Sequence, residues 1–186
     1  MSASQSGLHY RAIQAGDGVN WLRLGDDSLK PLKTFLKKDA RRFHEEYLAR
    51  TLVGVQPGER TVIAFATLVC ANILVKQLPE QERISGFKFD SYPAMMLARL
   101  AVDKRFQGQG IGTELLDLAI SFVVGSIMPI AGCRYLLVDA KESSVRFYER
   151  HGFAKLGELP DAASNLASMY VDLLPVARAV SDRDKP

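Results

Sequence analysis

The stretch Gln107-Gly108-Gln109-Gly110-Ile111-Gly112-Thr113 decides the fold of this chain. It follows an apolar run over 95–102 that is typical of a strand, and it precedes a periodic apolar run over 114–120 that is typical of a helix. The first N–H groups of a helix have no acceptor within it, and with the positive end of the helix dipole they bind anions such as a pyrophosphate. Glycines let the backbone approach such an anion because they carry no Cβ. The stretch therefore predicts either a phosphate-binding turn or a structural turn.

Two widespread nucleotide motifs do not match this stretch. Its glycines do not satisfy Gly-x-Gly-x-x-Gly, and no Gly-Lys-Ser/Thr follows them. Gln107, Gly110 and Gly112 instead resemble the cofactor signature Q/R-x-x-G-x-G/A of the GNAT acetyltransferase superfamily. A second segment, VRFYERHGF over 145–153, resembles the family's helix that ends in Y-E-x-x-G-F. The two segments in this order and at this spacing indicate the family over about residues 94–156.

The resemblance implies a fold and a cofactor. The fold is α/β, a GNAT-like three-layer fold with a mixed central sheet and helices on both faces. The co-substrate is acetyl-CoA, and no metal is expected. In the family, backbone groups of the strand and the glycine turn hold the pantetheine and the pyrophosphate. We therefore expect cofactor contacts at Leu100, Ala101, Val102, Gln107, Gly108, Gln109, Gly110, Ile111, Gly112 and Thr113.

Tyr148 is the candidate general acid. In the family, the tyrosine of this helix approaches the coenzyme sulfur, and a phenol stays protonated at neutral pH and can donate to a nascent thiolate. The alternative is a tyrosine that only packs beside Phe147 and Phe153. Many relatives have an asparagine seven residues before the tyrosine, where this chain has Lys141. We expect Lys141 to meet a coenzyme phosphate or solvent.

No general base is evident. Many relatives carry a glutamate on the strand before the glycine turn, but the run 95–102 has no carboxylate and carries Arg99 instead. We expect Arg99 to face the substrate or to meet a carboxylate such as Asp90 or Asp139. The missing base favours deprotonation through water, or an α-amine acceptor, whose pKa is about 8 against about 10.4 for lysine. His151 is expected to stabilise the end of its helix rather than to act as a base.

A narrower resemblance concerns the acceptor. The string LARLAVD over 97–103, taken with FYERHGF over 147–153, resembles the GNAT toxins of bacterial toxin–antitoxin modules. Those toxins acetylate the α-amine of aminoacyl-tRNA and are neutralised by a small DNA-binding antitoxin. A predicted helix near 30–47 places basic side chains on one face, where they can bind an RNA backbone or simply be solvated: Lys30, Lys33, Lys37, Arg41 and His44.

Composition and charge are those of an ordinary globular protein. The chain has 186 residues, 47% of them hydrophobic, and a net charge of +3, which neither requires nor excludes an acidic partner. We expect one domain over 8–175, between a disordered tail over 1–7 and a loose tail over 176–186. The longest apolar stretch is too short to span a bilayer, and the N-terminus does not resemble a secretory signal. We therefore expect a cytoplasmic protein with reduced cysteines and no membrane partner.

Three functions stay open from the sequence. The first is an acetyl-CoA-dependent N-acetyltransferase that acts on a primary amine by direct attack in a ternary complex. The second is a toxin that acetylates aminoacyl-tRNA, with tRNA contacts at Lys33, Lys37, Arg41 and Arg99, an antitoxin partner and a homodimeric state as open possibilities. The third is a sensor domain that binds acyl-CoA without turnover.

Overall fold

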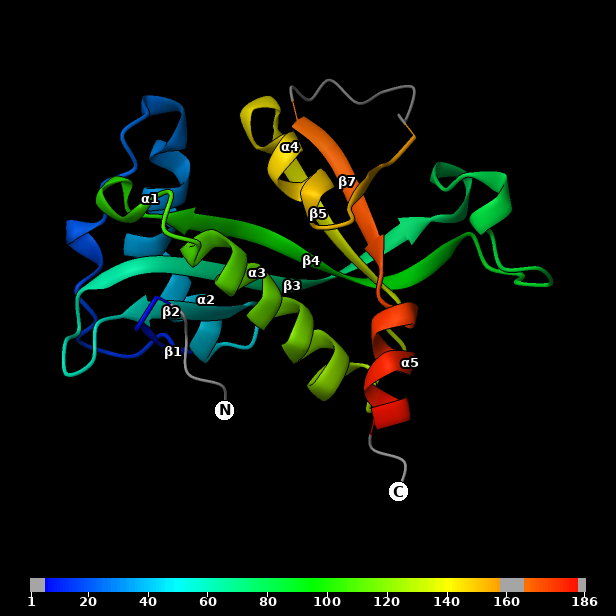
Figure 1. Cartoon of the computed structure of the whole chain (residues 1–186), viewed down its shortest axis with the longest axis horizontal. Helices are drawn as coiled ribbons and strands as arrows, with labels where there is room; N and C mark the ends of the chain where they lie inside the picture. The colour runs from blue at the N-terminus through cyan, green and yellow to red at the C-terminus, as the bar shows by residue number, and fades with distance from the viewer. Residues whose placement is uncertain (1–5, 158–165, 184–186) are drawn as a thin grey trace. The chain divides into compact units, whose positions relative to one another are not determined.

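The computed structural model describes residues 6–157 and 166–183. In that part of the chain, strands form one mixed sheet in the order β1-β2-β3-β4-β5-β7-β6 (Figure 1). The parallel pair is β4 with β5, and β5 pairs antiparallel with β7. The strands are β1 (His9–Ala12), β2 (Arg50–Val55), β3 (Val62–Leu74), β4 (Ser91–Val102), β5 (Tyr135–Lys141), β6 (Ala154–Lys155) and β7 (Leu166–Asp172).

The described residues also include α-helices. They are α1 (Lys30–Lys38), α2 (Ala40–Glu45), α3 (Ile111–Phe122), α4 (Glu142–Arg150) and α5 (Leu174–Arg183). A π-helical turn, Val123–Ile127, continues α3, and the helical path ends near Met128-Pro129. None of the described helices is both long enough and apolar enough to cross a bilayer.

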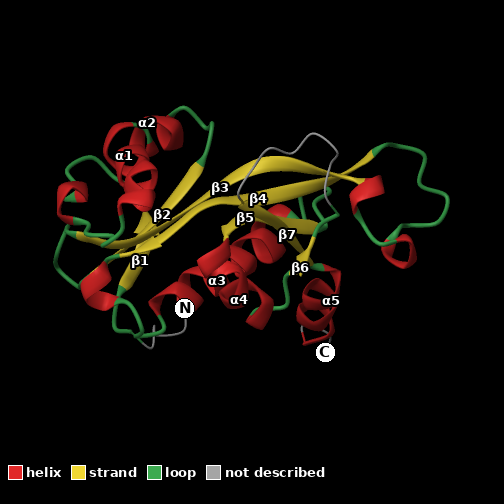
Figure 2. Ribbon diagram, turned by 90° about the horizontal axis from the view of Figure 1, so that it is seen from above, coloured by secondary structure: helices red, strands yellow, loops and turns green. Residues whose placement is uncertain are grey.

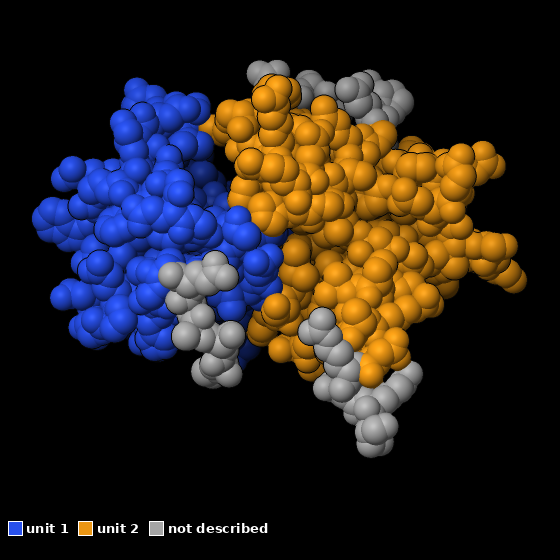
Figure 3. Space-filling model, viewed as in Figure 1, with its two compact units in different colours: residues 1–69, 97–119 blue, residues 70–96, 120–186 orange. Residues whose placement is uncertain are grey.

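The chain divides into two compact units, which Figure 3 colours separately. The first unit comprises 1–69 and 97–119, and the second comprises 70–96 and 120–186, so β3 and β4 each contribute residues to both. The prediction of a single domain over 8–175 stays a prediction.

The first unit has helices on both faces of its strands. Figure 2 shows α1 and α2 on one face and α3 on the other. An apolar cluster lies beneath α1 and α2. In it, Leu36 of α1 and Ala40 of α2 pack with Val53, Phe65 and Ala101 of the strands. This arrangement confirms the predicted three-layer α/β fold with a mixed sheet.

The second unit is centred on β5. Strand β5 lies between β4 and β7, and α4 packs on β5 and β7. An aromatic row fills the core here, with Tyr92 5.6 Å from Tyr135 and Tyr135 6.2 Å from Tyr170, measured between ring centroids. Burial of these rings supplies much of the apolar stabilisation of this unit.

Two predictions of secondary structure were wrong. The helix expected near 30–47 is two helices that meet at Asp39, whose side chain accepts a hydrogen bond from Arg42 Nη2 at 3.1 Å. Leu36 of the first helix and Ala40 of the second are buried in the same core. Tyr47, at the end of the range expected to be helical, is 84% exposed and lies beyond the second helix.

The loose tail expected over 176–186 is helical as far as residue 183. Asp172 starts α5 by accepting a hydrogen bond from the Leu174 N–H at 2.9 Å, and the fully buried Leu173 anchors the chain just before it. Residues 184–186, and residues 1–5 of the tail expected over 1–7, lie outside the described residues.

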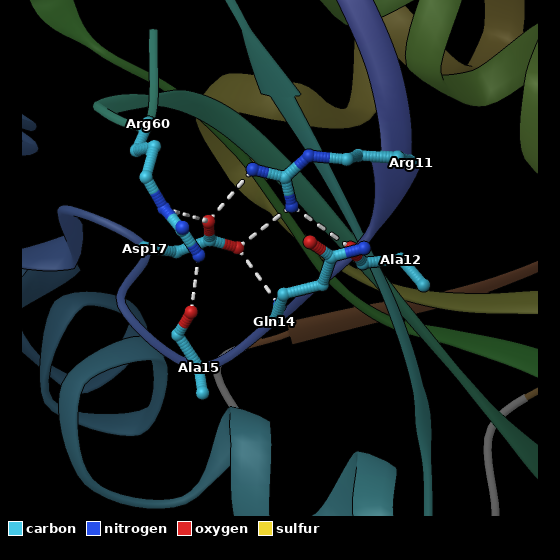
Figure 4. Close-up of polar contacts among 6 residues, drawn as sticks. All are labelled: Arg11, Ala12, Gln14, Ala15, Asp17 and Arg60. Atoms are coloured by element: carbon cyan, nitrogen blue, oxygen red, sulfur yellow. Dashed lines mark hydrogen bonds and ion pairs between the residues drawn. The ribbon is translucent and has the colours of Figure 1, made fainter.

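A buried carboxylate ties β1 to the loop after β2 (Figure 4). The side chain of Asp17 is 1% exposed, and its two oxygens accept from Arg11 at 2.7 and 2.8 Å. The Gln14 N–H donates to the same carboxylate, and Arg60 lies 3.9 Å away. Burial acts to raise the pKa of Asp17, but the hydrogen bonds from Arg11 and Gln14 outweigh it and lower the pKa below its usual range.

We predict that Asp17→Asn lowers the free energy of unfolding by about 3 kcal/mol, because it leaves the guanidinium of Arg11 half-buried without its partner charge. Since the pKa of Asp17 is lowered in the folded state, its contribution is present at neutral pH and is lost as the pH falls through that value. Urea unfolding at pH 7 and at pH 3 measures both effects. The exposed Glu59→Gln in the neighbouring loop is the control, and an equal loss in both variants would contradict the prediction.

Candidate active site

The glycine turn joins the end of β4 to the start of α3. Gly108 and Gly110 have φ of 77° and 80°, the left-handed region that favours glycine. A Cβ placed on either would meet no other atom within 4 Å, so the turn is open on this side. The Gln107 side chain lies back on the strand and donates from Nε2 to the Val102 carbonyl at 3.0 Å. Open space beside the turn is what a loop needs to receive a ligand on its backbone.

Asp103 anchors the turn and was not identified from the sequence as a site residue. Its side chain is fully buried and accepts hydrogen bonds from the N–H groups of Arg23 and Arg105, both at 2.9 Å. The Arg105 guanidinium donates to both of its oxygens, also at 2.9 Å. Burial acts to raise the pKa of Asp103, but these bonds outweigh it and lower the pKa. The sequence does contain a signal for this role: an aspartate stands directly after the apolar run 95–102 and shortly before the glycine-rich turn.

The start of α3 is held so that its donors point out of the helix toward the turn. The Glu114 N–H donates to the Gly110 carbonyl at 3.0 Å, which makes Gly110 the residue before the first helical turn. Ile111, Leu115 and Ala119 are buried and fix the helix against the strands. The N–H groups of Ile111 and Gly112 have no acceptor within the helix, so this end of α3 can receive an anion.

Arg99 lies on the same side of β4 as the buried Ala101, which belongs to the core beneath α1 and α2. Its guanidinium stacks over the Phe35 ring of α1 at 5.1 Å and donates to the Ala98 carbonyl at 2.7 Å. Leu100 and Val102, on the alternate face, are half-buried. The stacked guanidinium is therefore a fixed positive group on the α1 side of this strand.

Tyr148 lies on the inner face of α4 in the second unit. It is 8% exposed, and its ring centroid lies 5.1 Å from that of Phe147 and 5.4 Å from that of Phe153. Burial raises the pKa of Tyr148 to about 12, so its hydroxyl keeps its proton throughout the neutral range. Tyr148 does pack beside Phe147 and Phe153, as the alternative interpretation expected. This packing does not exclude a chemical role for its hydroxyl.

Two further predicted residues sit at the ends of α4. Lys141 precedes the helix as its N-cap residue and is half-buried. His151 follows it, and its Nδ1 lies 2.7 Å from the Phe147 carbonyl, which is the helix-end position expected for it. The roles of Lys141 and of the glycine turn toward a cofactor remain predictions.

The predicted basic face divides between two helices. Lys33 and Lys37 lie on α1, while the exposed Arg41 lies on α2, 3.8 Å from Glu45. His44 instead turns toward β2, where its Nδ1 accepts from the Thr51 N–H at 3.0 Å. Burial and the neighbouring Arg50 lower the pKa of His44, so it does not add a positive charge to this face at neutral pH.

Within residues 6–157 and 166–183, no group of three or more His, Cys, Asp or Glu side chains could hold a metal ion. A family model described as an acetyltransferase (GNAT) domain matches residues 61–155, which include β4, the glycine turn, α3 and α4. The chain belongs to the GNAT acetyltransferase family. Membership confirms the enzyme class and the family predicted from the two motifs.

Relatives of this GNAT protein include toxins. It is 31% identical over 141 residues to a tRNA-acetylating toxin of Mycobacterium tuberculosis, covering 76% of this chain and 80% of that one. A solved structure of AtaT complexed with acetyl-methionyl-tRNAfMet superposes with a TM-score of 0.79 at 22% identity, covering 93% and 99% of the two chains. An AtaT variant bound to acetyl-CoA and the C-terminus of the antitoxin AtaR gives a TM-score of 0.72, also at 22% identity, covering 94% and 99%.

We predict that Gly110→Ala weakens the binding of acetyl-CoA by at least tenfold, about 1.4 kcal/mol, because the loop must change its left-handed backbone to accept a Cβ. Calorimetry measures the affinity. Gly58→Ala is the matched control, since Gly58 has a φ of 79° and equally open surroundings in the turn after β2. Both variants should lose similar stability, and unchanged affinity in folded Gly110→Ala would place the cofactor elsewhere.

Proposed function

We propose that this GNAT enzyme transfers the acetyl group of acetyl-CoA to the α-amine of an aminoacyl-tRNA. The observation that carries the proposal is the 31% identity to a tRNA-acetylating toxin over 76% of the chain. The RNA product in the AtaT complex, acetyl-methionyl-tRNA, carries its acetyl group on an α-amine. The base-free strand β4 supports the same acceptor, because an α-amine is neutral in a larger fraction than a lysine side chain at neutral pH.

The proposed reaction is direct attack in a ternary complex. The neutral amine uses its lone pair to attack the thioester carbonyl carbon, the carbonyl π pair moves onto oxygen, and the carbon–sulfur bond then breaks as the carbonyl re-forms. Tyr148 donates its phenolic proton to the departing thiolate, and water accepts the proton that the amine loses. Backbone donors of the glycine turn and of the α3 start hold the pyrophosphate, so that binding energy from the coenzyme aligns the thioester.

Arg99 and the basic residues of α1 and α2 are the proposed contacts with the acceptor. The Arg99 guanidinium is already stacked on Phe35, so little side-chain entropy is lost when it binds an oxygen of the substrate. Lys33, with Arg23 and Asp26, lines a cavity of about 300 Å³ at the start of α1. Lys30 and Asp27 also line this cavity, so three cations face two carboxylates, and Lys37 and Arg41 continue the positive surface.

Further properties of the toxin relatives are proposed for this chain. We propose a toxin that an antitoxin protein neutralises, and a cytoplasmic location, where charged tRNA is found. The two cysteines, Cys70 and Cys133, are free, which agrees with a reducing compartment.

We predict that Tyr148→Phe leaves the affinity for acetyl-CoA unchanged and lowers kcat by about 10²–10⁴-fold, because the ring still packs while the proton donor is lost. Single-turnover kinetics measure the chemical step. The pH profile is a second readout: since the pKa of Tyr148 is raised to about 12, activity should rise as the α-amine loses its proton near pH 8 and should not fall by pH 9.5. A falling limb near pH 10 that disappears in Tyr148→Phe would show that the hydroxyl titrates at its ordinary value.

We predict that changing Lys33, Lys37 and Arg41 together to glutamate raises the KM for aminoacyl-tRNA and flattens its salt dependence by about one unit of slope for each lost phosphate contact. Affinity for acetyl-CoA should not change. The matched control changes three exposed lysines of the second unit, Lys76, Lys88 and Lys155, to glutamate. If the two triple variants had equal KM values at several salt concentrations, the prediction would be contradicted, and the basic residues of α1 and α2 would be solvated surface residues without tRNA contacts.

A further inference from the structure

The first turn of α3 is tied to the N-terminal strand by one carboxylate. Glu114 accepts hydrogen bonds from the Ser6 N–H at 2.6 Å, from Ser6 Oγ at 2.5 Å and from the Tyr10 hydroxyl at 2.6 Å. All three residues are partly buried and belong to the first unit. Burial and the bond to Glu114 raise the pKa of Tyr10, so its hydroxyl remains a proton donor at every physiological pH.

Gly54 is the sequence feature that lets Tyr10 reach this helix. It pairs with Tyr10 across β1 and β2, and a Cβ on Gly54 would lie 2.9 Å from Cε1 of the tyrosine ring. The ring therefore lies over the glycine, an arrangement that is known to stabilise glycine in strands. A larger residue at 54 would push the ring aside and with it the hydroxyl that holds Glu114.

The position of Glu114 makes its orientation important for an anion at the helix start. Its own N–H makes the first backbone bond of α3, to Gly110 of the glycine turn. A carboxylate in the first turn of a helix is attracted to the N-terminal N–H groups, which carry the positive end of the helix dipole. A pyrophosphate would need those same groups, and it would also be repelled by a nearby negative charge.

We propose that Ser6 and Tyr10 are positioning residues for cofactor binding, which hold the Glu114 carboxylate away from the start of α3 and so keep its donors available to the pyrophosphate of acetyl-CoA. This inference rests on the proposed function, because it takes acetyl-CoA as the ligand of the glycine turn. It adds the N-terminal strand to the elements that determine cofactor affinity, although that strand carries none of the family's motifs.

The test is a set of variants titrated with acetyl-CoA by calorimetry. Tyr10→Phe combined with Ser6→Ala removes both side-chain donors to Glu114, and we expect the Kd to rise about tenfold. Adding Glu114→Gln to the same variant removes the charge, and we expect the Kd to return to within about twofold of the wild-type value. We also expect the rise in Kd to shrink at high salt, because its cause is electrostatic.

Tyr170→Phe is the matched control, since the Tyr170 hydroxyl donates to Glu82 at 2.7 Å in the second unit, and its loss should leave the Kd unchanged. A rise in Kd that Glu114→Gln does not reverse would show general damage to the first unit and would overturn the inference, as would an unchanged Kd in the Ser6/Tyr10 variant. Absence of acetyl-CoA binding by the wild-type protein would instead overturn the proposed function. The two failures are therefore distinguishable.

Discussion

The buried carboxylate of Asp103 is the interaction on which the candidate site depends. It stands where β4 ends and the chain leads into the glycine turn, and its oxygens accept hydrogen bonds from Arg23 as well as from Arg105. Its own N–H donates to the Ile63 carbonyl of β3 at 2.7 Å, and the next N–H, of Lys104, donates to Arg23. These bonds fix residues 103–105, which lead into the turn, and so reduce the number of conformations open to a turn with two left-handed glycines.

Loss of freedom in the turn has a consequence for binding. A loop that is already ordered loses little conformational entropy when an anion arrives, so more of the contact energy appears as affinity. The same logic applies at the start of α3, where Glu114 is held by Ser6 and Tyr10 rather than left to move over the helix end. Asp103 and Glu114 are both acidic and both close in sequence to the proposed pyrophosphate site, and in each case hydrogen bonds direct the carboxylate to a protein partner.

The proposed chemistry needs little from the side chains. An α-amine is a neutral nucleophile in a substantial fraction at pH 8, and a phenol whose pKa is raised by burial keeps its proton at that pH until a thiolate is there to receive it. A strand without a carboxylate then suits the acceptor, because a strong base would be needed mainly for a protonated lysine. The positive groups near α1 are proposed to contribute recognition rather than bond making, in a chain whose net charge is only +3.

Local periodicity was sufficient for the strand–turn–helix context of the glycine motif. The resemblance of two motifs, over 107–113 and 145–153, was sufficient for the family and implied its mixed three-layer fold. The sequence also located β4, α3 and α4 to within a few residues. Only the tertiary structure decided the break at Asp39, the burial of His44 against β2 and the helix after Leu173, since each depends on which core or partner lies nearby. The tie from Tyr10 to Glu114 spans 104 positions, and no local pattern reports a contact of that separation. Long-range hydrogen bonds of this kind exist only once packing has brought their partners together.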